Sequence, residues 1–350
     1  MPTADASLHL RRRRRTSVIA GLVLAVALAL AGCGGDPGAG TGAAVGIAYG
    51  PGGRGDRAEN DLASIGVQRS VVAHDVRVQE AALSDEVPDR EVLLRLLAEG
   101  GNRLTVGIGP GYDRAVVPVA EDYPDHHFVV VGGEATGDNV AAVRFADEQG
   151  AFLVGAAAAL TSETGRIGIL VERADERARR HRAGYAAGAR HVRPDVEVDL
   201  WVIDDAPVDT AATEVAVARE LAVLLYEAGA DVVYEAAGGK VVGVLEAIRR
   251  LEADGRQRWA IGSGTDQYDE VSETAQSRLL TTMRSRLDLA VEVAVTGYVE
   301  RGGPSGTTVL GLAEGGVGYT DSGGHLDVVD DQLQALRRQI IAGEIEVPTS

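Results

Sequence analysis

Short apolar runs rich in valine and isoleucine alternate with longer helix-like stretches along most of the chain. The longer stretches combine Ala, Leu, Arg and Glu, with apolar residues at helical spacing. Strands and helices that alternate in this way form parallel sheets covered by helices, so we expect an α/β protein. The predicted strands are 44–48, 104–108, 128–131, 167–171, 196–203, 231–234 and 259–261, and the predicted helices include 90–98, 150–161, 211–228 and 241–253.

Residues 1–32 have the pattern of an export signal peptide. Arg11 to Arg15 form a basic segment, and residues 18–31 form an apolar segment too short for a comfortable membrane span. Leu30-Ala31-Gly32-Cys33 resembles a bacterial lipobox, which implies cleavage before Cys33 and acylation of that residue. We therefore expect a lipoprotein anchored in the lipid bilayer through Cys33, on the extracytoplasmic face of the cell membrane. Residues 33–43 are small and glycine-rich and are predicted to form a flexible tether.

The charge of the chain argues against one class of partner. The net charge is −18, and removal of residues 1–32, which carry five Arg and one Asp, leaves −22. So acidic a protein repels nucleic acid, and the sequence has no basic stripe with interleaved aromatic residues. No nucleic-acid partner is expected. Because Cys33 is the only cysteine, no disulfide can form within the chain, and its 350 residues suggest two domains stabilised by their cores.

A glycine-rich loop at residues 52–60 follows the first predicted strand. Ligands of parallel sheets bind at the carboxyl ends of the strands, where this loop lies. Its glycines, Gly52, Gly53 and Gly55, allow a ligand to approach the backbone closely. It is not a phosphate-binding P-loop, because no Gly-Lys-Ser/Thr closes it. The loop is either part of a ligand site or a simple strand-to-helix turn.

Several segments together resemble the basic membrane protein (Bmp/PnrA/Med) family of lipoproteins in order and spacing. These proteins are substrate-binding components of ABC importers, and the characterised members mostly bind purine nucleosides. The resemblance extends from about residue 45 to residue 348. The most specific match is EQGAFLVG at 148–155, which resembles the EGSFLAG motif of the family. Further matches are GGRGDRAEND at 52–61, TGRIG at 164–168, GYAAG at 184–188, GADVV at 229–233 and IAGEIEVP at 341–348.

This resemblance implies the type I periplasmic-binding-protein fold. That fold has two Rossmann-like lobes joined by a three-stranded hinge, and closure about the hinge traps the ligand between the lobes. We expect the chain to cross between the lobes near residues 163–166, 261–265 and 301–307. The N-terminal lobe would then comprise residues 44–164 plus 265–301, and the C-terminal lobe residues 165–264 plus 302–350.

The chain departs from the family at the positions that hold a nucleoside. In nucleoside-binding members, two aromatic rings sandwich the base, and carboxylates and a lysine hold the ribose and the base edges. Without these charge-assisted hydrogen bonds, nucleoside affinity should collapse. In this chain Gly50, Gly132 and Gly264 replace three carboxylates, Glu59 and His181 replace two phenylalanines, and Ser285 replaces the lysine.

Six residues are candidate ligand contacts. Lys240, the only lysine in the chain, follows the strand at 231–234 in a glycine-rich turn, where it either meets a ligand carboxylate or phosphate or is a solvated loop residue. Tyr49 either stacks on a ligand or packs in the hinge, and His181 either stacks or lies on a helix surface. Asn60 and Asp266 match family residues that are kept. The full set is Tyr49, Asn60, His181, Lys240, Asp266 and Ser285.

No catalytic constellation is apparent. The chain has no HExxH, CxxC or GxSxG motif. The adjacent His126 and His127 are expected on a solvated loop rather than at a metal. We therefore expect no enzyme activity, no cofactor and no metal.

The sequence favours a solute-binding lipoprotein that captures a small polar ligand and works with an ABC permease and an ATPase. The alternative is a ligand-free descendant of the fold that acts as a sensing or protein-interaction lipoprotein. Gly50, Gly132 and Gly264 favour the alternative, because glycine in place of a carboxylate removes a ligand-binding side chain from the pocket.

Overall fold

The computed structural model describes residues 42–350, apart from residues 57, 85–86, 174, 204–210 and 304. The predicted signal peptide, Cys33 and nearly all of the tether lie outside the described residues. Within the described ranges, no helix combines the length and the apolar character that a membrane span requires.

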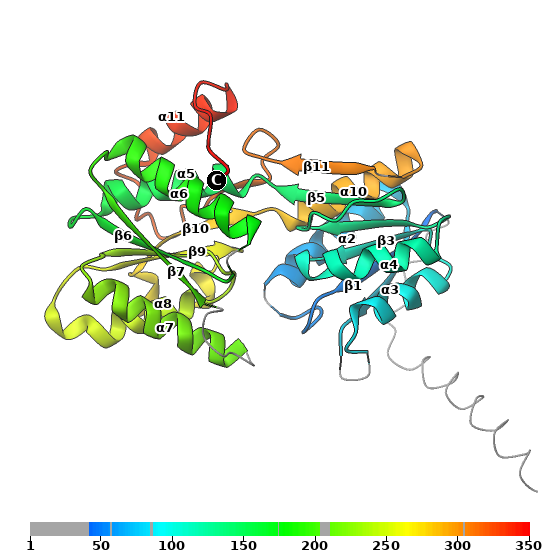
Figure 1. The fold of residues 1–350 in the computed structure, drawn as a ribbon, viewed down its shortest axis with the longest axis horizontal. Coiled ribbons are helices and arrows are strands. Elements are labelled where there is room, and N and C mark those ends of the chain that lie inside the picture. Colours follow the sequence, from blue (N-terminus) through cyan, green and yellow to red (C-terminus); the bar gives the residue numbers. More distant parts are fainter. Residues whose placement is uncertain (1–41, 57, 85–86, 174, 204–210, 304) are drawn as a thin grey trace, which may run out of the picture. The chain divides into compact units, whose positions relative to one another are not determined.

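Two six-stranded sheets organise the described chain (Figure 1). The first has the strand order β11-β5-β4-β3-β1-β2 and is parallel throughout. The second has the order β12-β10-β9-β8-β6-β7 and is parallel except for the pair β10–β12. The first sheet consists of β1 (Ala44–Tyr49), β2 (Arg77–Ala82), β3 (Leu104–Ile108), β4 (His127–Val131), β5 (Val140–Phe145) and β11 (Gly306–Leu310), and the second of β6 (Arg166–Val171), β7 (Glu197–Val202), β8 (Val232–Glu235), β9 (Trp259–Gly264), β10 (Leu279–Ser285) and β12 (Val317–Tyr319).

Helices cover both sheets, and the inner strands are buried as parallel strands between helices must be. These parallel sheets covered by helices confirm the predicted α/β class. We call each sheet together with its helices a lobe. The first lobe contains α2 (Glu59–His74), α3 (Arg90–Glu99), α4 (Asp113–Asp122) and α10 (Leu287–Arg301), and the second contains α5 (Asp147–Thr161), α6 (Glu176–Val192), α7 (Ala211–Glu227), α8 (Val241–Leu251), α9 (Glu273–Gln276) and α11 (Asp330–Ile341). Short 3-10 turns are η1 (Pro110–Tyr112), η3 (Glu252–Asp254) and η4 (Tyr268–Glu270).

The chain crosses between the lobes three times, but not at the predicted positions. β5 leads into α5, which packs on α6; β10 leads into α10, which packs on α2; and β11 is followed by β12. The crossings thus lie near Ala146, near Arg286 and within 311–316. Orange β11 therefore pairs with green β5 in Figure 1, although the two are far apart in sequence.

These positions move three segments relative to the predicted lobe boundaries. Residues 147–164 and 265–285 belong with the second sheet, and residues 302–310 belong with the first. The physical reason is that a helix between two strands can pack on either sheet, and its apolar spacing does not reveal which. Only its contacts decide, and those of α5 are with α6, β10 and β12.

Candidate functional site

Helices α5 and α6 pack backbone against backbone through glycines. A Cβ placed on Gly155 would lie 2.1 Å from the carbonyl oxygen of Tyr185, and one on Gly184 would lie 2.1 Å from that of Glu148. At Gly188 the corresponding oxygen, of Phe152, is 1.9 Å away. Only glycine fits at such contacts, which explains Gly155 of EQGAFLVG and both glycines of GYAAG. This packing holds α5 closely against α6.

Five charged or titratable side chains meet where the first turn of α5 packs against the first two turns of α6. The α6 charge cluster, as we call it, consists of Asp147 and Glu148 from α5 and of Arg177, Arg180 and His181 from α6. Asp147 is the centre: its Oδ1 lies 3.7 Å from Nε2 of His181, and its Oδ2 lies 3.7 Å from both guanidinium groups. The start of α6 follows β6, so the cluster lies at the carboxyl edge of the second sheet, where ligands of parallel sheets bind.

The cluster contains buried polar atoms that have no hydrogen-bond partner among the described residues. They are Oδ1 of Asp147, Oε2 of Glu148, Nε of Arg180 and Nε2 of His181. Buried polar atoms are normally hydrogen-bonded, because leaving one unpaired costs about 1–3 kcal/mol. The four atoms face one another in two pairs, Asp147 Oδ1 with His181 Nε2 at 3.7 Å and Glu148 Oε2 with Arg180 Nε at 3.9 Å.

His181 is fixed in this cluster as a neutral side chain. It is 1% exposed, and its Nδ1 lies 2.9 Å from the hydroxyl of Tyr234 on β8. Burial lowers the pKa of His181 to about 4, although the nearby Asp147 acts in the opposite direction. The predicted alternatives for His181 were a stacking contact and a helix surface; the structure buries it between α6 and the sheet.

One ion pair joins the cluster to the first lobe. Nη2 of Arg180 lies 2.6 Å from Oε1 of Glu134, which follows β4. The Arg180 side chain is 8% exposed, whereas that of Glu134 is 45% exposed. The carboxyl edges of both sheets therefore contribute to one site.

Tyr49 and Asn60 organise the glycine-rich loop after β1. Tyr49 is buried, and its hydroxyl donates to Glu80 at 2.9 Å. Asn60 accepts from the backbone N–H of Gly50 at 3.1 Å, and it donates to the carbonyl of Pro51 at 3.3 Å. In this conformation both side chains are bonded within the chain.

Lys240 is enclosed by acceptors of its own lobe. Its Nζ donates to the carbonyl of Ala237 at 2.8 Å and lies 3.4 Å from Glu214 and 3.9 Å from Glu172. Beneath it, Glu235 accepts from the backbone N–H groups of Ala237 and Lys240. Burial raises the pKa of Glu235 to about 7, against the opposing effect of Lys240. An anionic ligand would have to displace these carboxylates.

Asp266 and Ser285 also have partners in their own lobe. Asp266 accepts from the backbone N–H of Tyr268 at 3.1 Å and from the hydroxyl of Ser322. The hydroxyl of Ser285 is buried beside the sulfur of Met283, at 3.9 Å. Neither side chain contacts the α6 charge cluster.

The family model for PnrA-like ABC transporter substrate-binding proteins matches residues 45–350. The chain belongs to this family. The match spans both lobes, so the two-lobed architecture and the α6 charge cluster lie wholly within the family region.

Curated relatives and a solved structure agree with this placement. The chain is 29% identical over 319 residues to the CD4+ T-cell-stimulating antigen of Listeria monocytogenes, with 85% of each chain covered. It is 28% identical over 259 residues to the ABC transporter nucleoside-binding protein BmpA of Lactococcus lactis, covering 71% of this chain and 72% of BmpA. A solute-binding protein of an ABC transporter system from Aeropyrum pernix superposes with a TM-score of 0.70 at 24% identity, covering 88% of this chain and 94% of the other. The predicted type I periplasmic-binding-protein fold is confirmed.

The sequence analysis identified one member of the α6 charge cluster, His181, as a candidate ligand contact. It missed the two arginines of the cluster, Arg177 and Arg180. Arg177, Arg180 and His181 are three and four residues apart, so they share a helix face with Gly184. That spacing was visible in the sequence. What could not be seen is that this face meets the acidic start of α5.

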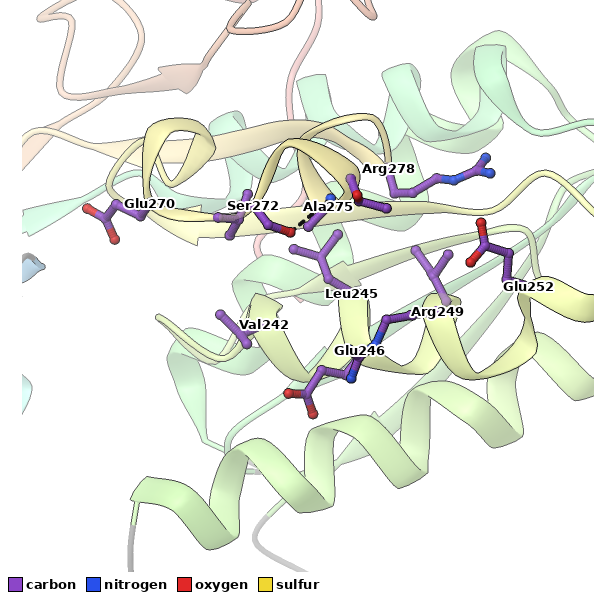
Figure 2. Close-up of a pocket in the computed structure, with 12 residues that line it drawn as sticks. Val242, Leu245, Glu246, Arg249, Glu252, Glu270, Ser272, Ala275 and Arg278 are labelled. Carbon is purple, nitrogen blue, oxygen red and sulfur yellow. Dashed lines mark hydrogen bonds between the residues drawn. The ribbon is translucent and has the colours of Figure 1, made fainter.

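Figure 2 shows a pocket of about 300 Å³ elsewhere in the second lobe, between α8 and the segment η4–α9. Apolar side chains such as Val242, Leu245 and Ala275 line it, with Glu246 and Arg249 among its charged residues. None of its lining residues belongs to the α6 charge cluster or to the described buried polar atoms without a partner.

Proposed function

We propose that this chain is the extracytoplasmic solute-binding lipoprotein of an ABC importer, without catalytic activity. It would capture a small polar ligand between its two lobes and present it to a permease that an ATPase drives. Membership of the PnrA-like substrate-binding family supports the importer role. The relative BmpA is named as a nucleoside-binding protein, which makes nucleosides the first class to test here.

The observation that carries this proposal is the α6 charge cluster, in which acidic and basic side chains of two helices meet. They lie at the carboxyl edge of the second sheet, and Glu134 of the first lobe reaches Arg180 at 2.6 Å. A polar solute bound beside the cluster would touch both lobes and form hydrogen bonds with charged side chains. Such bonds form only when both lobes surround the ligand, which couples binding to closure.

The membrane anchor is part of the same proposal. The lipobox-like sequence predicts that Cys33 is acylated and that the tether leads from it to β1. Replacement Cys33→Ser should abolish incorporation of labelled palmitate and release the protein from the membrane fraction of a bacterial host. Retention of the label in Cys33→Ser would contradict the anchor without touching the binding role.

A thermal-shift screen of residues 34–350 tests the binding role. The ligands are purine and pyrimidine nucleosides, free bases, amino acids, sugars and phosphorylated metabolites, and hits are confirmed by calorimetry. A true ligand at a hundredfold excess over its Kd should stabilise the folded chain by about 2.7 kcal/mol. No shift with any class would contradict the proposal.

A second candidate is a sensing or protein-interaction lipoprotein without a small ligand. One observation favours it: Tyr49, Asn60, Lys240 and Asp266 are all bonded within the chain. A failed ligand screen together with a protein partner captured at the carboxyl edges of the sheets would establish this role instead.

A further inference from the structure

The loop that follows β4 holds one carboxylate in a fixed place. The chain turns at Gly132, whose φ of 78° favours glycine. A Cβ on Gly133 would lie 2.3 Å from Oδ1 of Asp113, so glycine at this position leaves room for that carboxylate. The same Oδ1 accepts from the backbone N–H groups of Glu134 and Ala135, both at 2.9 Å. These charge-assisted bonds fix the backbone from which the Glu134 side chain extends.

The Glu134 side chain ends at an arginine of the other lobe. Its Oε1 lies 2.6 Å from Nη2 of Arg180. Two carboxylates of the second lobe, those of Asp147 and Glu148, lie farther from the Arg180 guanidinium group, at 3.7 and 3.9 Å. Of these three carboxylates, the nearest is therefore the one that the first lobe supplies.

The surroundings of the two charges make this contact reversible. The Glu134 side chain is 45% exposed, so water can hydrate its carboxylate when the lobes separate. Arg180 then still has the two buried acids of its own lobe beside it. Because separation leaves neither charge buried without compensation, the ion pair can break and form again without unfolding either lobe. Its free energy therefore acts on the equilibrium between joined and separated lobes.

We propose that Glu134 and Arg180 form a latch that holds the two lobes together before any ligand binds, and that Asp113 is the residue that positions it. The latch increases the fraction of molecules in the joined conformation. A ligand then needs less differential affinity for that conformation to complete closure. The inference concerns the two-lobed chain without a ligand, so it does not depend on the proposed solute-binding function.

Single-molecule fluorescence energy transfer between the lobes tests the latch without a ligand. Because Cys33 is the only cysteine, the chain from Gly34 onward can carry one dye pair at two introduced cysteines. Leu96→Cys on α3 and Leu224→Cys on α7 place the dyes at exposed positions of different lobes (Figure 1). The sample is unfolded, dialysed and refolded to remove bound solutes. The measured quantity is the ratio of molecules with separated lobes to molecules with joined lobes.

Glu134→Gln should raise this ratio about threefold to fivefold, because the amide keeps the size of the side chain and removes its charge. Glu121→Gln is the matched control and should leave the ratio unchanged, since Glu121 is an exposed acid on α4 of the same lobe. An increase in NaCl from about 0.05 to about 1 M should raise the ratio more in the parent than in Glu134→Gln, because salt screens the pair.

Asp113→Ala tests the positioning role. It should also raise the ratio, and adding Glu134→Gln to it should raise the ratio no further than Glu134→Gln alone, because both side chains act through one contact. Asp89→Ala is the matched control, because Asp89 also accepts from two backbone N–H groups, those of Glu91 and Val92. Asp89→Ala should lower the thermal stability of the chain but leave the ratio unchanged.

The outcomes separate the latch from the residue that positions it. Equal ratios in the parent, in Glu134→Gln and in Glu121→Gln would overturn the latch, as would a parent whose lobes are separated in all molecules. An effect of Asp113→Ala that Asp89→Ala reproduces, or that adds to the effect of Glu134→Gln, would overturn the positioning role of Asp113. The ligand screen tests solute binding separately, so a chain that binds a solute and shows no latch would leave the proposed function intact.

Discussion

At the scale of single residues, Arg180 is held by three carboxylates whose contributions are unequal. Glu134 is the nearest, at 2.6 Å, but its side chain is 45% exposed. Asp147 and Glu148 are farther away, at 3.7 and 3.9 Å, but both are buried. The charge of a buried carboxylate is stabilised mainly by its cation, because water cannot hydrate it. An exposed carboxylate is hydrated and loses little when its cation is removed.

This difference predicts an asymmetry between two substitutions. Glu134→Gln should reduce the free energy of unfolding by about 1 kcal/mol or less. Arg180→Gln should reduce it by about 2–4 kcal/mol, because it leaves Asp147 and Glu148 buried with less compensation. Urea unfolding measures both, with the exposed Arg182→Gln as the control. Equal losses for the two variants would contradict the cluster as described.

His181 predicts a dependence of stability on pH. Its pKa is about 4 in the folded chain, because burial disfavours the charged form, and near 6.5 when unfolded. Between these values the unfolded chain binds more protons, so stability falls as the pH drops from about 6.5 toward about 4. His181→Gln should remove about 2 kcal/mol of the loss that the parent shows between pH 6.5 and 4.5.

The comparison between variants isolates this effect. Burial also lowers the pKa of His126 to about 4, so the variant keeps part of the slope. The exposed His191→Gln is the matched control, because it removes a histidine without disturbing the cluster. If the free energy of unfolding falls equally with pH in the parent and in His181→Gln, then the pKa of His181 is not lowered by folding, and the prediction is wrong.

The sequence identified the residue types of the site better than their arrangement. The family block at 148–155 contains Glu148, and the departures from the family pointed to His181. The segment at 176–182 has four arginines among seven residues, so no single face of its helix stands out by composition. Which arginines are buried depends on where α5 packs, and that contact is tertiary.

At the scale of elements, the contact between α5 and α6 depends on glycine. Gly184→Ala would force a methyl group to within 2.1 Å of the carbonyl oxygen of Glu148 and push the helices apart. We expect it to cost about 1–3 kcal/mol or more and to weaken ligand binding, since the two helices carry the cluster. Thermal unfolding and calorimetry measure the two effects.

Gly318 provides the matched control for this prediction. A Cβ at Gly318 meets no other atom within 4 Å. Gly318→Ala should therefore be close to neutral, or slightly stabilising through the unfolded state. Similar losses for Gly184→Ala and Gly318→Ala would mean that the close helix contact does not stabilise the fold.

Strand prediction followed burial only in part. The buried strands β5 and β10 were missed, whereas the largely exposed edge strand β7 was predicted. β3, β4, β6 and β8 are buried along nearly their whole length and were predicted from their valines and isoleucines. β2 and β11 are the two edges of the first sheet, are largely exposed, and were missed. These two strands have no long apolar run to recognise, because solvent covers much of each.

At the scale of the whole molecule, the order of elements along the chain decides which parts form the site. The chain enters the second lobe directly at α5, so the acids of α5 belong to that lobe, whereas Glu59 and Glu134 belong to the first. The sequence predicted three crossings but misplaced them, since local patterns do not specify long-range packing. A ligand between these groups would be held by both lobes, which is the basis of the proposed capture.

Native mass spectrometry would test this account most directly without assuming a ligand. The chain from Gly34 onward is unfolded, dialysed, refolded and mixed with a small-molecule extract of bacterial cells. The account predicts a species heavier than the chain by the mass of one small polar solute, with occupancy kept in the exposed control Arg182→Gln. A spectrum with only the bare chain, from a folded sample and from several extracts, would contradict solute binding as the function of this protein.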